Sequence, residues 1–329
     1  MFNKIYTQIA ILILGVSVLL PSVARAHVKW FAESTEVVRP YQFTDFPVML
    51  SIVFVIGVLL VGIFLEKKLQ VPKWYNKLIQ QTAPTILSLA SIGFGLSFLI
   101  FSYNGFIFAP NLQVDAFGFG LLLLSIQAVA GLMILLGLYE RLGGLLLILL
   151  YTLAVSRFGF MEMMDTLEMV GFAFYAMIIG RPKWKIVESE LMCSITHHVH
   201  QYGVSILRIG IGLNLIILGF SEKILKPSLT QNFLSTYDWN FMHNLGYTWF
   251  TDYWFAYAGG VAEALFGLFF LFGFVTRLSV IALAMFLVTT LILLGPIELI
   301  GHLPHFSIAL VLLVFGAGSR MHMKKQYRS

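Results

Sequence analysis

The sequence predicts an all-α integral membrane protein, with one N-terminal transmembrane helix and two tandem four-helix bundles related by a parallel pseudo-twofold repeat. Three observations lead to this prediction: an apolar composition, long uncharged stretches and an internal duplication. Hydrophobic residues make up 59% of the 329 residues and charged residues 11%, and the mean hydropathy is +0.87. A water-soluble domain of this length could not bury so much apolar surface, so the main partner is the lipid bilayer. Lipid offers backbone polar groups no partner, so the spans must be helical.

The duplication is visible as a repeated pattern of small residues. Residues 88–112 align with residues 205–229 at an offset of 117, which pairs Gly93 with Gly210 and Gly95 with Gly212. From Gln127 onward the offset is 136 and holds without a gap, so the second copy carries 19 extra residues in one loop. Each copy has an even number of expected spans and enters the membrane in the same direction. This predicts a pseudo-twofold axis along the membrane normal.

The N-terminal elements precede the repeats. Residues 1–26 resemble a secretory signal peptide, with Lys4 before an apolar run and Ala24-Arg25-Ala26 as a cleavage site. Cleavage would leave His27 as the first residue of a periplasmic segment, 27–46, although an uncleaved signal anchor is the alternative. Residues 47–83 are expected to form one transmembrane helix, 47–64, and a cytoplasmic loop.

The two repeats follow in order. The first, degenerate repeat covers 84–181 and a cytoplasmic linker covers 182–202. The second repeat covers 203–320, and a basic cytoplasmic tail covers 321–329. The expected spans are 84–107, 117–138, 142–158 and 166–180 in the first copy, and 203–221, 256–274, 278–295 and 303–318 in the second.

Basic residues determine the expected orientation. They gather in the loops that this topology assigns to one side: Lys67, Lys68, Lys73, Lys77, Arg141, Arg181, Lys183, Lys185, Arg277, Arg320, Lys324, Lys325 and Arg328. The positive-inside rule makes that side cytoplasmic, which predicts a multi-pass protein of the bacterial inner membrane with a periplasmic mature N-terminus. Nucleic-acid binding is not expected from such patches, and the single cysteine, Cys193, excludes an internal disulfide.

Ionisable residues near spans are costly, so each is a candidate for function. On this topology they collect at the outer leaflet: Glu162, Asp165, Glu168, Glu222, Lys223, Glu263, Glu298, His302 and His305. Of these, Glu298, His302 and His305 form the sharpest cluster, since the two imidazoles lie three residues apart on one side of a helical turn. The cluster could hold zinc or copper, or could relay protons, and the alternative is a polar helix start that faces water.

Three further features have two interpretations each. Glu263 begins its span where the first copy has Gln127, and it is either a proton acceptor or an interhelical hydrogen-bonding group. The inserted loop is rich in aromatic residues and forms either an interfacial belt or a lid, in which case Lys223, Trp249 and Trp254 would bind a cofactor. His27, as a first residue, could chelate copper through its amine and imidazole together with His302 or His305, although any residue can follow a cleavage site by chance.

The second copy resembles the DoxX/DoxD family of small four-helix membrane proteins. The resemblance rests on Gly219 and Lys223 at the end of the first span, on a motif in and after the second span that begins with Glu263 and ends with Thr276 and Arg277, and on a polar start to the last span. It covers residues 203–320 clearly and residues 85–181 weakly. It implies a membrane subunit associated with respiratory or sulfur redox chemistry, in some members with electron transfer to quinone.

The sequence therefore predicts a redox-linked accessory subunit in which Glu263, Glu298, His302 and His305 handle protons or a quinone headgroup, rather than an enzyme with independent catalysis. No haem or flavin motif is visible, so the electron carrier would be quinone, a metal or a redox partner protein, in a homo- or hetero-oligomer. One alternative is a copper-handling membrane protein that uses His27. Another is a small-solute transporter, which requires polar residues near the middle of the bilayer, where only Asn214, Thr289 and Thr290 occur.

Overall fold

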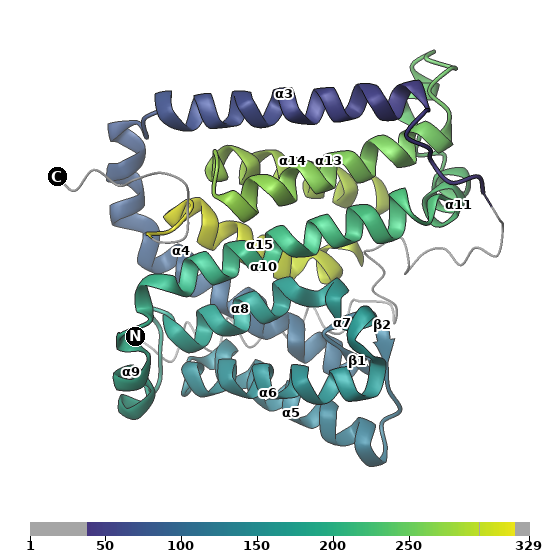
Figure 1. The fold of residues 1–329 in the computed structure, drawn as a ribbon. Helices are drawn as coiled ribbons and strands as arrows, with labels where there is room; N and C mark the ends of the chain where they lie inside the picture. Colours follow the sequence, from purple (N-terminus) through teal and green to yellow (C-terminus); the bar gives the residue numbers. More distant parts are fainter. Residues whose placement is uncertain (1–37, 296, 320–329) are drawn as a thin grey trace.

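The computed structural model describes residues 38–295 and 297–319, and the chain there is helical apart from one short hairpin (Figure 1). The expectations for the signal peptide, for His27 and for the tail 321–329 lie outside the described residues. Within the described part, six helices are long and apolar enough to cross a membrane: Phe46–Lys68 (α3), Lys73–Tyr103 (α4), Gly118–Leu136 (α5), Glu140–Phe158 (α6), His200–Ile224 (α10 with its flanking turns) and Asp252–Phe272 (α13). The protein is therefore a multi-pass, predominantly helical membrane protein.

The other expected spans correspond to shorter helices. These are α8 (Leu167–Ile178), α14 (Thr276–Leu294) and α15 (Ile297–Phe315), of which the apolar parts of α14 and α15 are Thr276–Ile292 and Gly301–Phe315. A short helix, α7 (Phe160–Met163), and a 3₁₀ turn, η1 (Met164–Thr166), lead into α8. Among the described helices, nine thus correspond to the nine expected spans.

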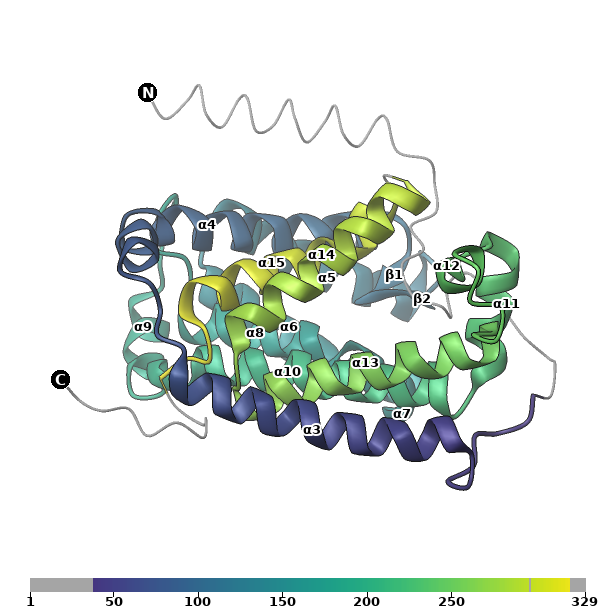
Figure 2. The same cartoon turned by 90° about the horizontal axis from the view of Figure 1, so that it is seen from above.

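The helices pack in a closed order (Figures 1 and 2). Each of α4, α5, α6, α8, α10, α13, α14 and α15 contacts the next, and α15 returns to contact α4. The last helix of the first half, α8, packs on the first helix of the second, α10 (Gly203–Leu218), just as α15 packs on α4. Outside this ring, α3 lies along α13, where a Glu66 carboxylate oxygen accepts the backbone N–H of Val275 at 2.9 Å.

Glycines allow the closest helix crossings in both halves. A Cβ atom on Gly95 would lie 2.5 Å from the backbone nitrogen of Leu135 and 2.7 Å from the carbonyl oxygen of Gly131. A Cβ atom on Gly212 would lie 2.8 Å from the nitrogen of Leu271 and 2.9 Å from the oxygen of Gly267. Backbones approach this closely in membranes only where side chains are small. The aligned residues Gly95 and Gly212 therefore lie at equivalent helix crossings, between α4 and α5 and between α10 and α13.

The linker between the two halves contains a short amphipathic helix, α9 (Glu190–His197). The Ser189 side chain caps it by accepting the backbone N–H of Met192 at 3.3 Å. Met192 and Thr196 are buried against the bundle, whereas Leu191 and Ile195 are exposed. Figure 1 shows α9 at the opposite end of the molecule from α11 (Pro227–Tyr237) and from the hairpin of β1 (Phe106–Ile107) and β2 (Ala109–Gln113).

Three boundaries differ from the sequence expectations. α4 begins at Lys73, inside the predicted cytoplasmic loop, because the helix continues through Pro84 without a break. Only residues 69–72 therefore link α3 to α4. The inserted loop of the second half is folded into α11 and α12 (Phe241–Asn244). The corresponding connection of the first half is the hairpin, which the all-helical prediction lacked; Phe108, with φ +62°, occupies its turn.

Candidate functional site

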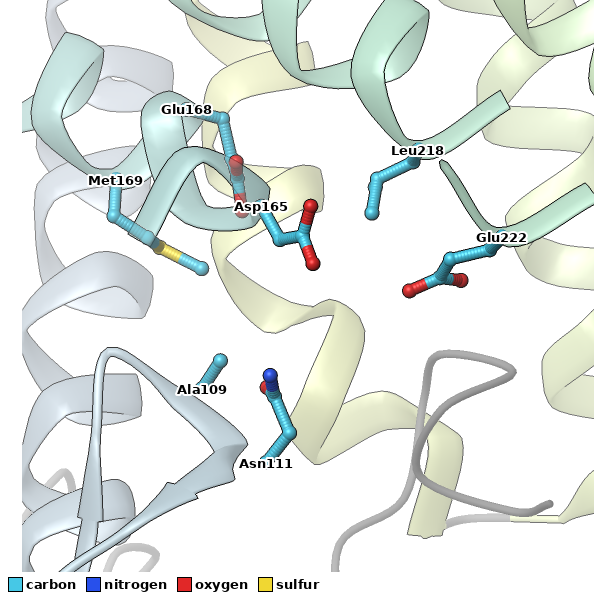
Figure 3. A pocket seen from close by; sticks show the side chains of 7 residues that line it. All are labelled: Ala109, Asn111, Asp165, Glu168, Met169, Leu218 and Glu222. Atoms are coloured by element: carbon cyan, nitrogen blue, oxygen red, sulfur yellow. The ribbon is translucent and has the colours of Figure 1, made fainter. Parts of the chain in front are cut away.

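A polar pocket lies at the end of the molecule that carries the hairpin and α11, where the two halves meet (Figure 3). We call it the junction pocket. The space between the lining residues, open solvent included, is about 280 Å³. In Figure 3 the carboxylates of Asp165 and Glu222 face one another across the pocket, with Asn111 below them. The lining residues are Ala109, Asn111, Asp165, Glu168, Met169, Leu218 and Glu222.

The first half contributes carboxylates from the start of α8. Asp165 lies in the 3₁₀ turn and Glu168 in the first turn of the helix, where acidic side chains favour the positive end of the helix dipole. Glu168 is 1% exposed. No described residue gives a hydrogen bond to its Oε2 atom. A buried carboxylate oxygen of this kind is costly, which singles out Glu168 as a candidate for function.

The second half contributes Glu222 through a π-helical segment, η3 (Gly219–Ile224). The backbone N–H of Leu225 donates to Phe220 O at 2.8 Å, the i to i−5 bond of a π turn. Gly219 crosses Gly260 so closely that a Cβ atom would lie 2.6 Å from the Gly260 oxygen. Within this segment Glu222 lines the junction pocket, whereas its neighbour Lys223 binds Glu263, with 2.8 Å between Nζ and Oε2.

The two histidines of α15 lie beside the junction pocket. His305 Nε2 is 3.9 Å from Glu168 Oε1, too long for a hydrogen bond but within electrostatic range. The ring centroids of His302 and His305 are 5.6 Å apart, and both side chains are buried. His305 of the second half is therefore next to a carboxylate of the first.

The predicted site residues divide into separate groups. His302 and His305 lie together, but Glu263 is paired with Lys223, and no described contact joins Glu263 to the histidines. Glu298 lies in α15, but its side chain, like His27, is outside the described residues. Among the described residues, no group of three or more His, Cys, Asp and Glu side chains is arranged to hold a metal ion.

The two tryptophans are also apart from Lys223. Trp249 is 70% exposed and contacts Tyr247 and Phe250. Trp254 packs against Tyr41, with ring centroids 5.9 Å apart, in the segment that leads into α3. The described contacts therefore do not join Lys223, Trp249 and Trp254 into one cofactor site.

Tyr41 fastens this lead-in segment to α13. Its hydroxyl donates to Tyr253 O at 2.7 Å, and burial raises the pKa of the phenol above its ordinary value. Asp45 nearby accepts the backbone N–H of Gln42 at 3.0 Å and the Arg39 guanidinium at 2.6 Å. The Gln42 hydrogen bond and, to a lesser degree, Arg39 lower the pKa of Asp45.

The opposite end of the first half contains a buried ion-pair network. Glu140 accepts from Arg181 Nε at 2.8 Å and from Ser91 Oγ at 2.7 Å. Arg141 donates to the terminal carbonyls of α8, among them Ile179 O at 2.8 Å, and to Glu188 Oε1 at 3.2 Å. The hydrogen bond from Lys185 and that from Arg141 lower the pKa of Glu188 below its ordinary value.

The sequence analysis named Asp165, Glu168 and Glu222 as outer-leaflet groups but left them out of its proposed site. A signal for Glu168 was present: the offset of 136 pairs it with Pro304, between the two histidines. Under a twofold repeat, such positions lie at equivalent turns of α8 and α15 and can approach one another. The pocket role of Asn111 had no sequence signal, because it depends on the hairpin.

Comparison with known proteins supports the family assignment. The DoxX family model matches residues 203–296, which include α10 to α14 and exclude His302 and His305. No curated protein and no solved structure matches the chain. The clear part of the resemblance, in the second half, is confirmed over the matched residues. The match identifies a DoxX domain at residues 203–296 of this multi-pass helical membrane protein.

Proposed function

We propose that the protein is a redox-linked accessory subunit of the inner membrane whose junction pocket exchanges protons with a quinone headgroup. The observation that carries this proposal is the meeting of buried Glu168 and His305, with 3.9 Å between Oε1 and Nε2, at the edge of a pocket. Chains of acidic and histidine side chains inside membranes are typical of proton relays. Histidine exchanges protons near physiological pH, and a quinone takes up protons with electrons.

The architecture that we propose for this function is a pair of four-helix halves related by a pseudo-twofold axis along the membrane normal. Support comes from equivalent contacts. Gly210 crosses Gly171 between α10 and α8, and Gly93, its repeat partner, meets Ser307 between α4 and α15. Such an axis brings the starts of α8 and α15 together at the periplasmic end, where the mature N-terminus would also lie.

The pocket also has apolar walls, which suit the ring of a headgroup. Met169 and Leu218 line it beside the three carboxylates. Electrons would come from a redox partner protein, because the sequence carries no haem or flavin motif.

Binding of a short-chain quinone to the purified protein in nanodiscs tests this proposal. We expect Glu168→Gln and His305→Gln to weaken binding by about tenfold, equivalent to about 1.4 kcal/mol, and to flatten its pH dependence. Glu162→Gln is the matched control, since it makes the same change on an exposed side chain near the start of α8. Wild-type affinity in both site variants, or no binding to the wild type, would refute the proposal.

A copper-handling role is the second candidate, favoured by the two neighbouring imidazoles of α15. It requires His27 as a further ligand. Metal analysis after verified signal cleavage separates the two functions. Stoichiometric copper that is lost on His27→Ala would favour copper handling, and protein purified without copper would exclude it.

A further inference from the structure

Buried polar groups continue from the junction pocket toward the opposite end of the molecule. Glu168, Phe172 and Tyr175 follow one another along α8 at spacings of four and three residues, so they lie on one face of the helix. The rise from Glu168 to Tyr175 is about 10 Å. Tyr175 is completely buried, and no described residue hydrogen-bonds its hydroxyl.

The far end of this series is the network around Glu140. Tyr175 lies close enough to Glu140 for the two groups to interact electrostatically. Glu140 is 6% exposed and is held by Ser91 and Arg181. A carboxylate is therefore buried at each end of the face of α8 that carries Tyr175.

Two stacked aromatic rings separate the two ends. Phe94 of α4 and Phe172 of α8 have ring centroids 3.7 Å apart, an interplanar angle of 20° and no exposed surface. Phe172 also contacts Tyr175, with centroids 5.4 Å apart. Apolar constrictions of this kind close membrane pathways by excluding water.

A further buried polar group lies on the neighbouring helix. Asn214 is completely buried in α10, and neither amide atom has a hydrogen-bond partner among the described residues. It lies one helical turn from Leu218, which lines the junction pocket. An unsatisfied amide inside a membrane is costly, so Asn214 is a second buried polar group without a structural explanation beside the pocket.

We infer that the contact region between the two halves is a proton pathway from Glu140 through Tyr175 to Glu168, closed at rest by the stacked rings of Phe94 and Phe172. A proton that reaches the Glu168 carboxylate neutralises it and can pass on to the junction pocket. The inference rests on the proposed function, because it supplies the source of the protons exchanged there. It adds a connection to the cytoplasmic end that the proposed function does not require.

Proton flux into proteoliposomes tests the pathway. The purified protein is reconstituted without quinone, a pH dye is enclosed and a potassium diffusion potential drives protons inward. We expect Phe94→Ala and Phe172→Ala to raise the flux at least about tenfold over the wild type, because the constriction is lost. Adding Tyr175→Phe or Glu168→Gln should return the flux to the wild-type level. A Tyr175 that only fills space would give no such reversal.

Phe269→Ala is the matched control, since this buried phenylalanine packs against Gly62 of α3 outside the ring of helices. Its flux should equal that of the wild type. Should the alanine variants fail to fold, Phe94→Leu and Phe172→Leu keep most of the volume, and we expect them to leak less but measurably. The pathway would be overturned if the variants of Phe94 and Phe172 conducted protons no faster than the wild type. It would also be overturned if Tyr175→Phe and Glu168→Gln did not reduce their proton flux. Quinone binding is measured in a separate assay, so failure of the proton pathway and failure of the proposed function can be distinguished.

Discussion

The turns between α5 and α6 and between α13 and α14 are built alike in the two halves, whereas the turns at the hairpin end differ. Arg141 donates to the last carbonyls of α8, and Arg277, its partner at the offset of 136, donates to Leu313 O at 3.0 Å and to Val314 O at 2.9 Å at the end of α15. The preceding turns also agree, with positive φ angles at Gly137 and Tyr139 and at the paired Gly273 and Val275.

At the hairpin end, the paired residues Gln127 and Glu263 have different partners. Gln127 is fully buried and fastens the hairpin: its Oε1 accepts the N–H of Phe108 and its Nε2 donates to Phe106 O, both at 2.8 Å. Glu263 instead pairs with Lys223, beside the π-helical segment that carries Glu222. The shared turns therefore maintain the helix framework, whereas the different partners of Gln127 and Glu263 give each half its own structure at the hairpin end, where both halves contribute residues to the junction pocket.

The strongest test of the shared framework concerns the helix crossings. Gly95→Leu and Gly212→Leu each place a side chain against a backbone atom, so we expect both to prevent recovery of folded protein from membranes. Gly57→Leu is the control, because a Cβ atom at Gly57 meets nothing within 4 Å. Fluorescence-detected size-exclusion chromatography measures the folded fraction. If only one of the two variants were recovered as folded protein, the two helix crossings would not be equivalent.

Arg141 and Arg277, which donate to the last carbonyls of α8 and α15, provide a second test of the comparison, with a smaller expected effect on stability. Arg141→Gln leaves buried carbonyls of α8 and the hydroxyl of Thr196 without their donor, and we expect it to lower the unfolding free energy by about 2 to 4 kcal/mol. Arg277→Gln should cost less. Thermal unfolding in detergent compares the two variants, and an equal or larger loss for Arg277→Gln would contradict this ranking.

The charged pair of the second half provides the third test. Lys223→Met leaves a partly buried Glu263 without its cation, at an expected cost of about 2 kcal/mol, between the ranges for surface and buried pairs. Glu263→Gln restores the amide found in the first half and should cost about 1 kcal/mol. A double-mutant cycle on thermal stability measures the coupling, and additive single effects would show that the pair contributes nothing.

The smallest effect concerns Glu188, the acidic partner of Arg141. Among the described residues, Arg277 donates to backbone carbonyls. The lowered pKa of Glu188 means that its stabilising contribution is fully present above the unfolded value of about 4.3 and disappears as the pH falls through the folded value. Because Glu188 is partly exposed, we expect about 0.2 to 1 kcal/mol. The melting-temperature difference between wild type and Glu188→Gln should therefore shrink between pH 7 and pH 3.5. A constant difference would mean that Glu188 acts through packing.

Much of the helix framework could be predicted from the sequence, because helices that cross a membrane need long uncharged stretches and pack closely at small residues. The alignment paired Arg141 with Arg277 and Gly95 with Gly212, and the structure gives these pairs equivalent contacts. The hairpin was missed because β1 has only two residues and β2 only five, too few for an alternating pattern to be recognised. The helices α11 and α12 of the inserted loop were not predicted, because aromatic residues are typical of a membrane interface in any conformation.

The candidate site shows the same division. The sequence by itself determined a helical membrane protein, its duplicated glycines and the set of ionisable residues at one end, because composition and spacing are local properties of the chain. Only the tertiary structure decided that Glu263 pairs with Lys223 and that His305 meets Glu168 of the other half. Those contacts depend on a π turn and on the packing of α8 and α15, and no spacing along a single helix encodes which distant side chains share a pocket.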